Sequence, residues 1–411
     1  MKVLHVITVL GVGGTEVQLR SLVRHSRHEC EVITLLRAGP VADLLRDDGV
    51  PVRNLRMASN KQVSALPRLW RLMRAGRYDV VHAHHYRSQI YARPAARLAG
   101  VPVVVSTEHS IGETHLDGKH RITPGVRALY LGTECFSDMT IAVSQAVRDR
   151  LLRWGVPERK LAAIPNGIDL GRVAFDMSAG ARVRAALGIG TGDYVIGALG
   201  RLDANKRVHL LIEAAAPLLS RGVRLLVVGD GDERLRLAGT AGTCGVAERV
   251  VFAGERHDVG AMLSAMDLFV TTSREETFGL SAVEAAANGM PVLYTTCPAL
   301  DGLMVARARR VPPTVMGVRG AMATEVAAGR RERVPRPAIA SEYDIRDVAA
   351  RIDGLYERLA ARDRVTPCAA PAMPSAIPAA SAAATGGIGA ILDDHTGRPA
   401  QWSDRNPACP G

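Results

Sequence analysis

Residues 271–289 read TTSREETFGLSAVEAAANG, and this stretch indicates more about the protein than any other part of the chain. The apolar run 268–270 directly before it is typical of a buried strand. The Ala-rich part that follows a polar loop is typical of a helix. We expect that helix to end at Asn288 and Gly289, because glycine suits the left-handed position after a helix. The stretch therefore predicts a strand, a polar loop and a helix in succession.

Two carboxylates flank the start of this predicted helix. Glu276 lies in the loop and Glu284 lies within the helix. The backbone N–H groups of Phe278, Gly279 and Leu280 are expected at the helix N-terminus, where such groups lack helical partners and bind phosphate well. Carboxylates around an anion site indicate a phosphorylated ligand rich in hydroxyl groups, such as a nucleotide sugar. Glutamates also occur at helix starts for stability alone, so this stretch by itself leaves both interpretations open.

Glu276 and Glu284, eight positions apart, resemble the acidic signature of retaining glycosyltransferases of family 4, which have the GT-B fold. The resemblance covers residues 1–305 and again 343–361. It implies an α/β protein with two Rossmann-like domains, each built on a doubly wound parallel sheet, that face a cleft. Three other segments resemble the same family and follow in the family's order: VGGTE at 12–16, IPNGID at 164–169 and LGRLDANK at 199–206.

The alternation of short apolar strands with helix-like stretches points to parallel, doubly wound sheets in both halves of the chain. Strands are predicted at 3–10, 30–36, 80–82, 101–107 and 139–143, and again at 194–199, 224–228, 250–252, 268–271 and 291–294. Helices of the first half should begin near Thr15, Lys61, Ser88 and Ser144.

The chain is accordingly expected to have four parts. Residues 1–170 form an acceptor-side domain, and residues 171–342 form the domain that binds the nucleotide sugar. By the family's pattern, a helix at 343–363 crosses back onto the first domain. The remaining stretch, 364–411, is rich in Ala, Pro, Ser and Gly, cannot bury a core, and is predicted to be a disordered tail.

Arg201 and Lys206 are the candidate cations for the diphosphate. They follow the predicted strand 194–199 and Gly200, so the loop would carry both side chains to the carboxyl end of the sheet. A departing nucleoside diphosphate gains negative charge, which positioned Arg and Lys groups stabilise without a metal. Most Arg and Lys residues are solvated surface cations, but the position after a strand and a glycine favours a functional role.

Gly13 and Gly14 form a tight turn between the first strand and the first helix. The turn is not a dinucleotide-binding fingerprint, because Glu16 stands where the third glycine would be needed. Its N–H groups could approach a diphosphate or a sugar, and a purely structural turn is the alternative. The family resemblance favours a contact with the donor.

His109 follows the predicted strand 101–107, and the resemblance places a histidine at this point beside the donor sugar. His82, His84 and His85 have a spacing seen in metal ligands. The resembled family transfers sugars without a protein-bound metal, so we expect these three to line the cleft. Neither a metal nor a cofactor is expected besides the nucleotide sugar.

One segment departs from the family's pattern. After residues 291–293 the family has a pair of glycines and a glutamate near the donor, whereas this chain continues TTCPALD from Thr295. The hydroxyl groups of Thr295 or Thr296 are the candidates to replace the glycine amides. The Arg-rich stretch that follows, 304–337, has no assigned structure.

Composition limits the class of protein. A chain of 411 residues is too long for one ordinary core and predicts two domains. No apolar run reaches the roughly 20 residues that span a bilayer, and the apolar stretch 3–10 is too short for a signal peptide. The six cysteines show no paired spacing, so neither a disulfide framework nor a zinc site is indicated. We expect a cytoplasmic location.

The net charge is +11, and residues 1–170 hold 24 Lys and Arg against 15 Asp and Glu, a net charge of +9. Arg68, Arg71, Arg74 and Arg77 recur at helical spacing. This favours an amphipathic helix packed on a sheet, and a peripheral contact with the anionic inner face of a membrane is the alternative. With 4% aromatic residues the chain has little material for stacking on nucleic-acid bases, and no nucleic-acid partner is expected.

These features predict a retaining hexosyl- or acetylhexosaminyl-transferase. It would move a hexose-type sugar from a UDP or GDP donor to an acceptor hydroxyl in polysaccharide, glycolipid or natural-product glycan synthesis. By the family's pattern, Glu276 contacts the sugar hydroxyls and Glu284 contacts the ribose. The alternatives are a nucleotide-sugar epimerase or hydrolase on the same frame, and a non-catalytic scaffold that binds sugar nucleotides.

Overall fold

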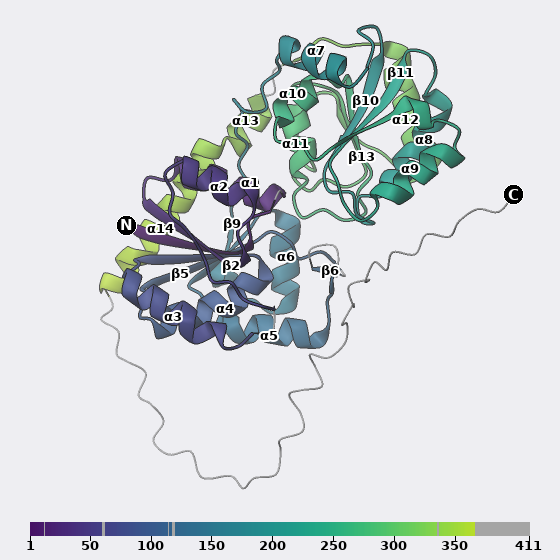
Figure 1. Cartoon of the computed structure of the whole chain (residues 1–411). Helices are drawn as coiled ribbons and strands as arrows, with labels where there is room; N and C mark the ends of the chain where they lie inside the picture. Colours follow the sequence, from purple (N-terminus) through teal and green to yellow (C-terminus); the bar gives the residue numbers. More distant parts are fainter. Residues whose placement is uncertain (12, 60–61, 114, 117–119, 335–336, 366–411) are drawn as a thin grey trace, which may run out of the picture. The chain divides into compact units, whose positions relative to one another are not determined.

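The computed structural model describes residues 1–365 with the exception of residues 12, 60–61, 114, 117–119 and 335–336 (Figure 1). Met1–Thr366 form one compact unit, and Pro367–Gly411 form a second unit that lies outside the described residues. The predicted tail at 364–411 is therefore described only at residues 364 and 365, which belong to the last helix.

A parallel sheet forms the first half of the described chain. Its strand order is β3-β2-β1-β4-β5-β8-β9, and every neighbouring pair of strands is parallel. The order reverses between β1 and β4, which is the point where doubly wound sheets bind their ligands. The strands are β1 (Lys2–Val9), β2 (Glu29–Arg37), β3 (Val52–Asn54), β4 (Val80–His84), β5 (Val103–Glu108), β8 (Met139–Ala142) and β9 (Leu161–Ala163).

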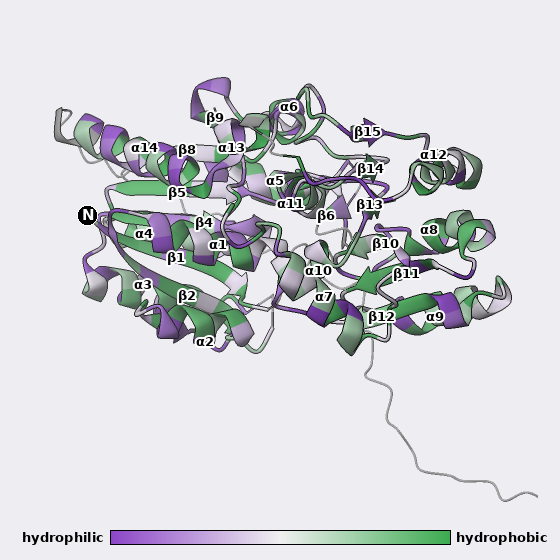
Figure 2. Cartoon of the chain, turned by 90° about the horizontal axis from the view of Figure 1, so that it is seen from above, coloured by the Kyte–Doolittle hydropathy of each residue, from purple (hydrophilic) through white to green (hydrophobic). Residues whose placement is uncertain are grey.

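Helices cover both faces of this sheet because its strands are apolar on both sides, as the green strands in Figure 2 show. On β1, Val3 and Ile7 pack with one set of helices, and Leu4 and Val6 pack with another. The connecting helices are α1 (Gly14–His25), α2 (Pro40–Asp47), α3 (Ala65–Gly76), α4 (His85–Leu98), α5 (Pro124–Glu134) and α6 (Gln145–Trp154), and a small antiparallel pair, β6 (His115–Leu116) with β7 (His120–Arg121), follows β5.

Helix starts in the first half agree with the sequence to within a few residues. Helix α6 begins after Ser144, whose hydroxyl accepts a hydrogen bond from the Val147 N–H as an N-cap does. Helix α3 begins at Ala65 rather than near Lys61, and α4 begins at His85 rather than near Ser88. The prediction for α4 was late because His85 enters the helix with a positive φ of 69°, an uncommon conformation that sequence pattern does not reveal.

A second parallel sheet forms the other half, in the order β12-β11-β10-β13-β14-β15. The fold class predicted from the sequence, two doubly wound parallel sheets with helices, is thereby confirmed. Part of the unassigned stretch 304–337 supplies β15 and α12. The elements are β10 (Tyr194–Leu199), β11 (Val223–Val228), β12 (Val250–Gly254), β13 (Leu268–Thr271), β14 (Val292–Tyr294) and β15 (Ala308–Arg310), with α7 (Met177–Ala186), α8 (Val208–Ala215), α9 (Arg234–Thr243), α10 (Val259–Ser264), α11 (Leu280–Ala287), α12 (Val315–Ala328) and α13 (Pro337–Tyr343).

The last helix, α14 (Ile345–Val365), returns to the first sheet (Figure 1). Its apolar side, including Val348 and Ile352, belongs to the same buried core as β1 and α1. The Tyr356 hydroxyl lies 2.5 Å from Nδ1 of His82 on β4. The helix begins and ends two residues later than the predicted range 343–363.

Helix α3 is amphipathic and packs on the sheet, as its spacing predicts. Ala65, Leu69 and Met73 are buried in its core-facing side, while Arg71 and Arg74 are exposed. Within the described part of the chain, no helix combines the length and the apolar character needed to cross a bilayer.

Candidate active site

The loop between β13 and α11 carries the acidic pair of the sequence motif. Helix α11 begins at Leu280, and Gly279 precedes it with a φ of 96°. A Cβ atom at Gly279 would lie 2.4 Å from Sγ of Cys297, so both the backbone conformation and the space require glycine. The Phe278 side chain is buried and anchors the loop. The predicted helix N-terminus at Phe278, Gly279 and Leu280 is therefore where the sequence placed it.

Lys206 and Glu276 are brought together by neighbouring strands. Lys206 follows β10 and Glu276 follows β13, and these two strands pair in the sheet. Nζ of Lys206 donates to Oε1 of Glu276 at 2.5 Å, and the two side chains are 24% and 14% exposed. The partial burial strengthens their attraction relative to a surface pair. A cation and a carboxylate thus lie in contact at the carboxyl end of the second sheet.

Arg201 lies in the same loop as Lys206 but makes a different contact. Its Nε donates to Oδ2 of Asp203 at 2.9 Å, and its side chain is 56% exposed. The loop is positioned by the turn after β11, because the Leu202 N–H donates to the Asp230 carbonyl. Gly229 allows this approach, since a Cβ there would lie 2.0 Å from the Gly200 carbonyl oxygen. Asp203 thus holds the Nε side of the Arg201 guanidinium group, while more than half of the side chain is exposed to solvent.

Asn205 is a residue that the sequence analysis did not single out. Its side-chain N–H donates to the Glu275 carbonyl at 2.8 Å, and its side-chain oxygen accepts from the Glu275 N–H at 3.1 Å. The Arg274 N–H donates to the Asn205 carbonyl. Asp203 accepts from the N–H groups of Asn205 and Lys206, which is the local pattern that Asp favours in turns. That pattern, Asp followed two residues later by Asn, was the available signal.

Glu284 is buried in α11 near the segment that joins the two sheets. Its Oε1 lies 3.8 Å from a guanidinium nitrogen of Arg172. Burial raises the pKa of Glu284 to about 7, and the charge of Arg172 acts in the opposite direction. The Glu284 carboxyl group therefore keeps its proton to a higher pH than an exposed glutamate does.

The first glycine turn lies against the start of α11. Gly14 opens α1, and a Cβ there would lie 3.2 Å from a methyl carbon of Leu280. The Glu16 carboxylate folds back over Gly13, at 2.4 Å from where a Cβ would stand. The two glycines thus bring α1 close to the predicted phosphate site.

Three further contacts join the Glu276 loop to the first half of the chain. The Thr277 hydroxyl donates to the His109 carbonyl at 2.6 Å, and the Ser144 hydroxyl donates to the Thr277 carbonyl at 2.6 Å. The Glu113 N–H donates to Oε2 of Glu275 at 3.0 Å. The loop that holds Glu276 is therefore fixed from both sides.

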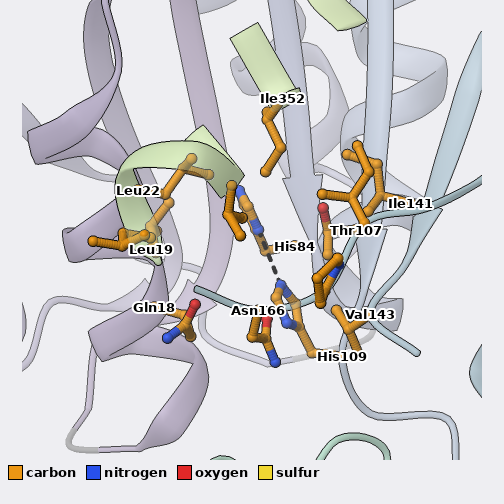
Figure 3. Close-up of a pocket in the computed structure, with 14 residues that line it drawn as sticks. Gln18, Leu19, Leu22, His84, Thr107, His109, Ile141, Val143, Asn166 and Ile352 are labelled. Carbon is orange, nitrogen blue, oxygen red and sulfur yellow. Dashed lines mark hydrogen bonds between the residues drawn. The ribbon is translucent and has the colours of Figure 1, made fainter. Parts of the chain in front are cut away.

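His109 is partly buried and lines a small cavity of about 20 Å³ together with Gln18, His84 and Asn166 (Figure 3). This volume suits a single water molecule. Nε2 of His109 lies 3.3 Å from Nδ1 of His84. Burial, followed by the neighbouring His85, holds the pKa of His109 well below its usual value, and a hydrogen bond with Asn166 opposes this shift.

The buried histidines His5, His82 and His84 offer nitrogen atoms within 4.8 Å of one another, which is close enough to consider a metal ion. His82 uses both ring nitrogens on hydroxyl groups, those of Tyr356 at 2.5 Å and Thr107 at 2.6 Å. His5 and His84 are hydrogen-bonded to each other at 3.0 Å. Apart from Nε2 of His5, the ring nitrogen atoms are thus hydrogen-bonded to other imidazoles or to hydroxyls, which fits a hydrogen-bonded cluster better than a ligand set. That no metal is needed stays a prediction.

The loop after β14 braces the Glu276 loop. The Thr295 hydroxyl donates to the Ser273 carbonyl at 2.7 Å, and the Thr296 hydroxyl donates to the Arg274 carbonyl at 3.4 Å. Each hydroxyl proton is therefore used inside the protein. In this conformation the two threonines do not offer those protons to an anion as the sequence analysis suggested.

Two family descriptions match the chain, and together they span most of both sheets. "Glycosyltransferase Family 4" matches residues 12–172, and "Glycosyl transferases group 1" matches residues 181–306. The chain belongs to this family of glycosyltransferases, which transfer sugars from nucleotide donors, and it has the GT-B fold.

Relatives of known activity support the same class. D-inositol 3-phosphate glycosyltransferase 1 of Catenulispora acidiphila is 32% identical over 66% of this chain and 69% of that protein. A GDP-mannose-dependent alpha-mannosyltransferase of Mycobacterium tuberculosis is 30% identical over 69% of this chain and 75% of that protein. A UDP-Gal:alpha-D-GlcNAc-diphosphoundecaprenol alpha-1,3-galactosyltransferase of Escherichia coli is 28% identical over 63% of this chain and 69% of that protein.

Solved structures share the fold. Anabaena HepE in complex with UDP-glucose has a TM-score of 0.76 at 21% identity, and the match covers 87% of this chain and 100% of HepE. Sucrose-phosphate synthase from Thermosynechococcus elongatus has a TM-score of 0.74 at 20% identity, with coverage of 88% and 100%.

The raised pKa of Glu284 gives a test of its burial. Between the unfolded value near 4.5 and the folded value of about 7, the unfolded chain loses its proton while the folded chain keeps it, so stability falls as pH rises through this window. The neutral variant Glu284→Gln should therefore be more stable than the parent at pH 8, by up to about 3 kcal/mol. At pH 4 the two proteins should unfold alike.

Thermal or urea unfolding at both pH values checks this, with Glu357→Gln on exposed α14 surface as the control that should change little at either pH. An equal effect of Glu284→Gln at pH 4 and pH 8 would show that the carboxyl group is not buried as described.

Proposed function

We propose that this protein transfers a hexose-type sugar from a UDP or GDP donor to an acceptor hydroxyl, with retention of configuration at the anomeric carbon. The observation that carries the proposal is the Lys206–Glu276 pair at the start of α11. The pair consists of a cation, which suits a diphosphate, and a carboxylate, which suits sugar hydroxyls. The relatives include a UDP-Gal-dependent and a GDP-mannose-dependent enzyme, which supports this donor class.

In this proposal Arg201 and Lys206 hold the diphosphate, and the amides at Phe278, Gly279 and Leu280 bind the donor at the positive end of α11. When a donor binds, the Lys206 ammonium group either moves from the Glu276 carboxylate to the phosphate oxygens or contacts both. The pair therefore keeps both groups at the site before a donor binds. Arg201, half exposed, can turn toward the diphosphate at small cost.

The remaining candidates surround the same point. Glu276, released by Lys206, accepts hydrogen bonds from sugar hydroxyls, and Glu284 accepts them from the ribose. Gly13 and Gly14 allow the first loop to approach the donor, because a larger residue at Gly14 would press on Leu280. His109 contacts the sugar from the first half of the chain.

Retention follows from a front-side attack. The acceptor hydroxyl approaches on the face from which the diphosphate leaves, and a phosphate oxygen takes up its proton as the glycosidic oxygen–carbon bond forms. The carbon–oxygen bond to the diphosphate breaks, and its electron pair goes to the leaving group. Lys206 and Arg201 stabilise the charge that develops there.

Other activities on this frame predict different products. An epimerase or hydrolase would convert the donor without an acceptor, giving an isomer or a free sugar. A scaffold would bind nucleotide sugars and convert nothing. Incubation with panels of UDP- and GDP-sugars, with and without hydroxyl acceptors, followed by mass spectrometry, separates these outcomes from transfer.

The exposed arginines of α3 support a second, peripheral proposal about location. Arg71 and Arg74 face solvent on a helix whose other side is buried, in the half of the chain that carries the excess positive charge. We propose that this surface rests on anionic lipid while the enzyme acts. Such an attraction is electrostatic and is screened by salt.

Vesicle co-sedimentation tests the contact with lipid. Vesicles containing anionic lipid should pellet the protein at low salt and release it at high salt, and an Arg71→Gln/Arg74→Gln variant should bind less. Neutral vesicles serve as the control. A protein that stays in the supernatant with anionic vesicles at low salt does not use this surface on a membrane.

Substitution at the ion pair tests the transfer mechanism. Lys206→Ala should lower kcat by on the order of 100-fold, the scale for losing one preorganised group that stabilises the transition state. Glu276→Gln should nearly abolish transfer but leave binding of the nucleoside diphosphate unchanged, because the carboxylate addresses the sugar. Steady-state kinetics and calorimetric titration with UDP and GDP measure both effects.

Arg236→Ala, which removes an exposed cation paired with Glu233 on α9, is the control and should leave kcat unaltered. A kcat of Lys206→Ala within threefold of the parent value would place the diphosphate elsewhere.

A further inference from the structure

A row of three imidazoles, of which His5 and His84 are buried and His109 is partly buried, ends at the candidate sugar contact. Nδ1 of His5 lies 3.0 Å from Nε2 of His84, and Nδ1 of His84 lies 3.3 Å from Nε2 of His109 (Figure 3). The row runs from the centre of the first sheet, at β1 and β4, to the end of β5. The His82 ring is tilted by 33° against that of His84, with 4.1 Å between the ring centroids, but its nitrogen atoms bond to hydroxyl groups, so it does not belong to the row.

All three imidazoles are neutral near pH 7. Burial lowers the pKa of His5 to about 3 and holds those of His84 and His109 well below 6.5. A neutral imidazole carries one N–H and one lone pair, so a donor at one nitrogen requires an acceptor at the other. The row therefore has only two arrangements, with every N–H pointing toward His109 or every N–H pointing toward His5.

The two arrangements differ in where the terminal N–H is left. With the protons pointing toward His5, the N–H stands on Nε2 of that residue, which is buried and has no hydrogen-bond partner among the described residues. A buried N–H without an acceptor is costly. With the protons pointing toward His109, Nε2 of His5 is a bare lone pair, and the terminal N–H stands on Nδ1 of His109. Among the described residues that atom is equally buried and has no hydrogen-bond partner of ordinary geometry, so the two ends differ only in the space beside them.

The His109 end can satisfy an N–H, because that residue lines the cavity of about 20 Å³ with Asn166 and Gln18. One water molecule or one ligand oxygen fits there. His5 does not line this cavity. The arrangement that points toward His109 is therefore the favoured one, and it defines the tautomer of every member of the row.

We propose that His84, with His5 behind it, is a positioning residue that holds His109 in the Nδ1–H tautomer, so that His109 offers its ligand a hydrogen-bond donor and no base. The Nε2 lone pair of His109 is taken by His84, and its Nδ1 already carries a proton. His109 therefore cannot remove a proton from an acceptor hydroxyl, and it donates to an oxygen of the sugar. The identity of that ligand rests on the proposed function; the tautomer does not.

Nuclear magnetic resonance of the full chain labelled with ¹⁵N-histidine reads the tautomer directly, without any substrate. The His109 resonances, assigned by their loss in His109→Asn, should show a protonated Nδ1 and an unprotonated Nε2 at pH 7. A protonated Nε2 on His109 would overturn the proposal. If Nδ1 is protonated but no donor and acceptor pair is turned over, the proposed function fails while the positioning stands.

A pair of variants at His84 tests the positioning itself. In His84→Gln the amide can still donate to Nε2 of His109, whereas in His84→Leu nothing can. His84→Leu should lower kcat/KM by about 10-fold or more, the scale of one lost buried hydrogen bond, and should lose the preference for protonated Nδ1. His84→Gln should rescue both. Equal loss in the two variants, with equal thermal unfolding and an unchanged His109 tautomer, would reduce His84 to a packing residue.

Discussion

Hydrogen bonds from side chains of one loop to the backbone of its neighbour are the constraint on which the site depends. The loops follow β10 and β13, and Asn205 joins them by accepting from and donating to the backbone of Glu275. The Thr272 hydroxyl closes the same junction by donating to the carbonyls of Lys206 and Arg207. Because the strands are neighbours, this junction leaves little freedom, and Lys206 and Glu276 must meet. An ion pair held this way loses less side-chain entropy than one formed by two mobile surface residues.

The same loop is also tied to the first sheet, through Thr277 at the His109 carbonyl and through Glu275 at the Glu113 N–H. Gly112 suits this close approach, since a Cβ there would lie 2.7 Å from the His115 carbonyl oxygen. The positions of the proposed sugar carboxylate and of His109 are therefore linked by one short run of backbone. The imidazole row of His5 and His84 continues this chain of hydrogen bonds from His109 into the core of the first sheet.

The sequence predicted those parts of the molecule that rest on periodicity and local motif. Most strands of both sheets, the glycine turns and the helix start after Phe278 follow from apolar alternation and from backbone conformations that favour glycine. The three-residue strands β3, β9 and β15 were not predicted, because so short a run carries no alternation pattern. The pairing of Lys206 with Glu276 does not, because 70 residues separate them and only the strand order makes them neighbours. Sequence reasoning likewise placed Thr295 and Thr296 toward an anion, whereas packing of the loop after β14 turns both hydroxyls to carbonyls.

Buried titratable groups were the least predictable part. Nothing in the segments around His5, His84 and His109 shows that the three rings align, since they lie on three different strands or strand ends that the fold alone brings side by side. The raised pKa of Glu284 is a similar case, because its cause is burial within α11 and not any charge near it in sequence. Both features depend on tertiary packing.

The configuration of the product tests the central claim most directly. With a UDP-α- or GDP-α-sugar donor and an acceptor identified by screening, the account predicts an α-linked product, read from the coupling constant of the anomeric proton in the purified glycoside. A β-linked product from the same donor would contradict front-side transfer at the Lys206–Glu276 site.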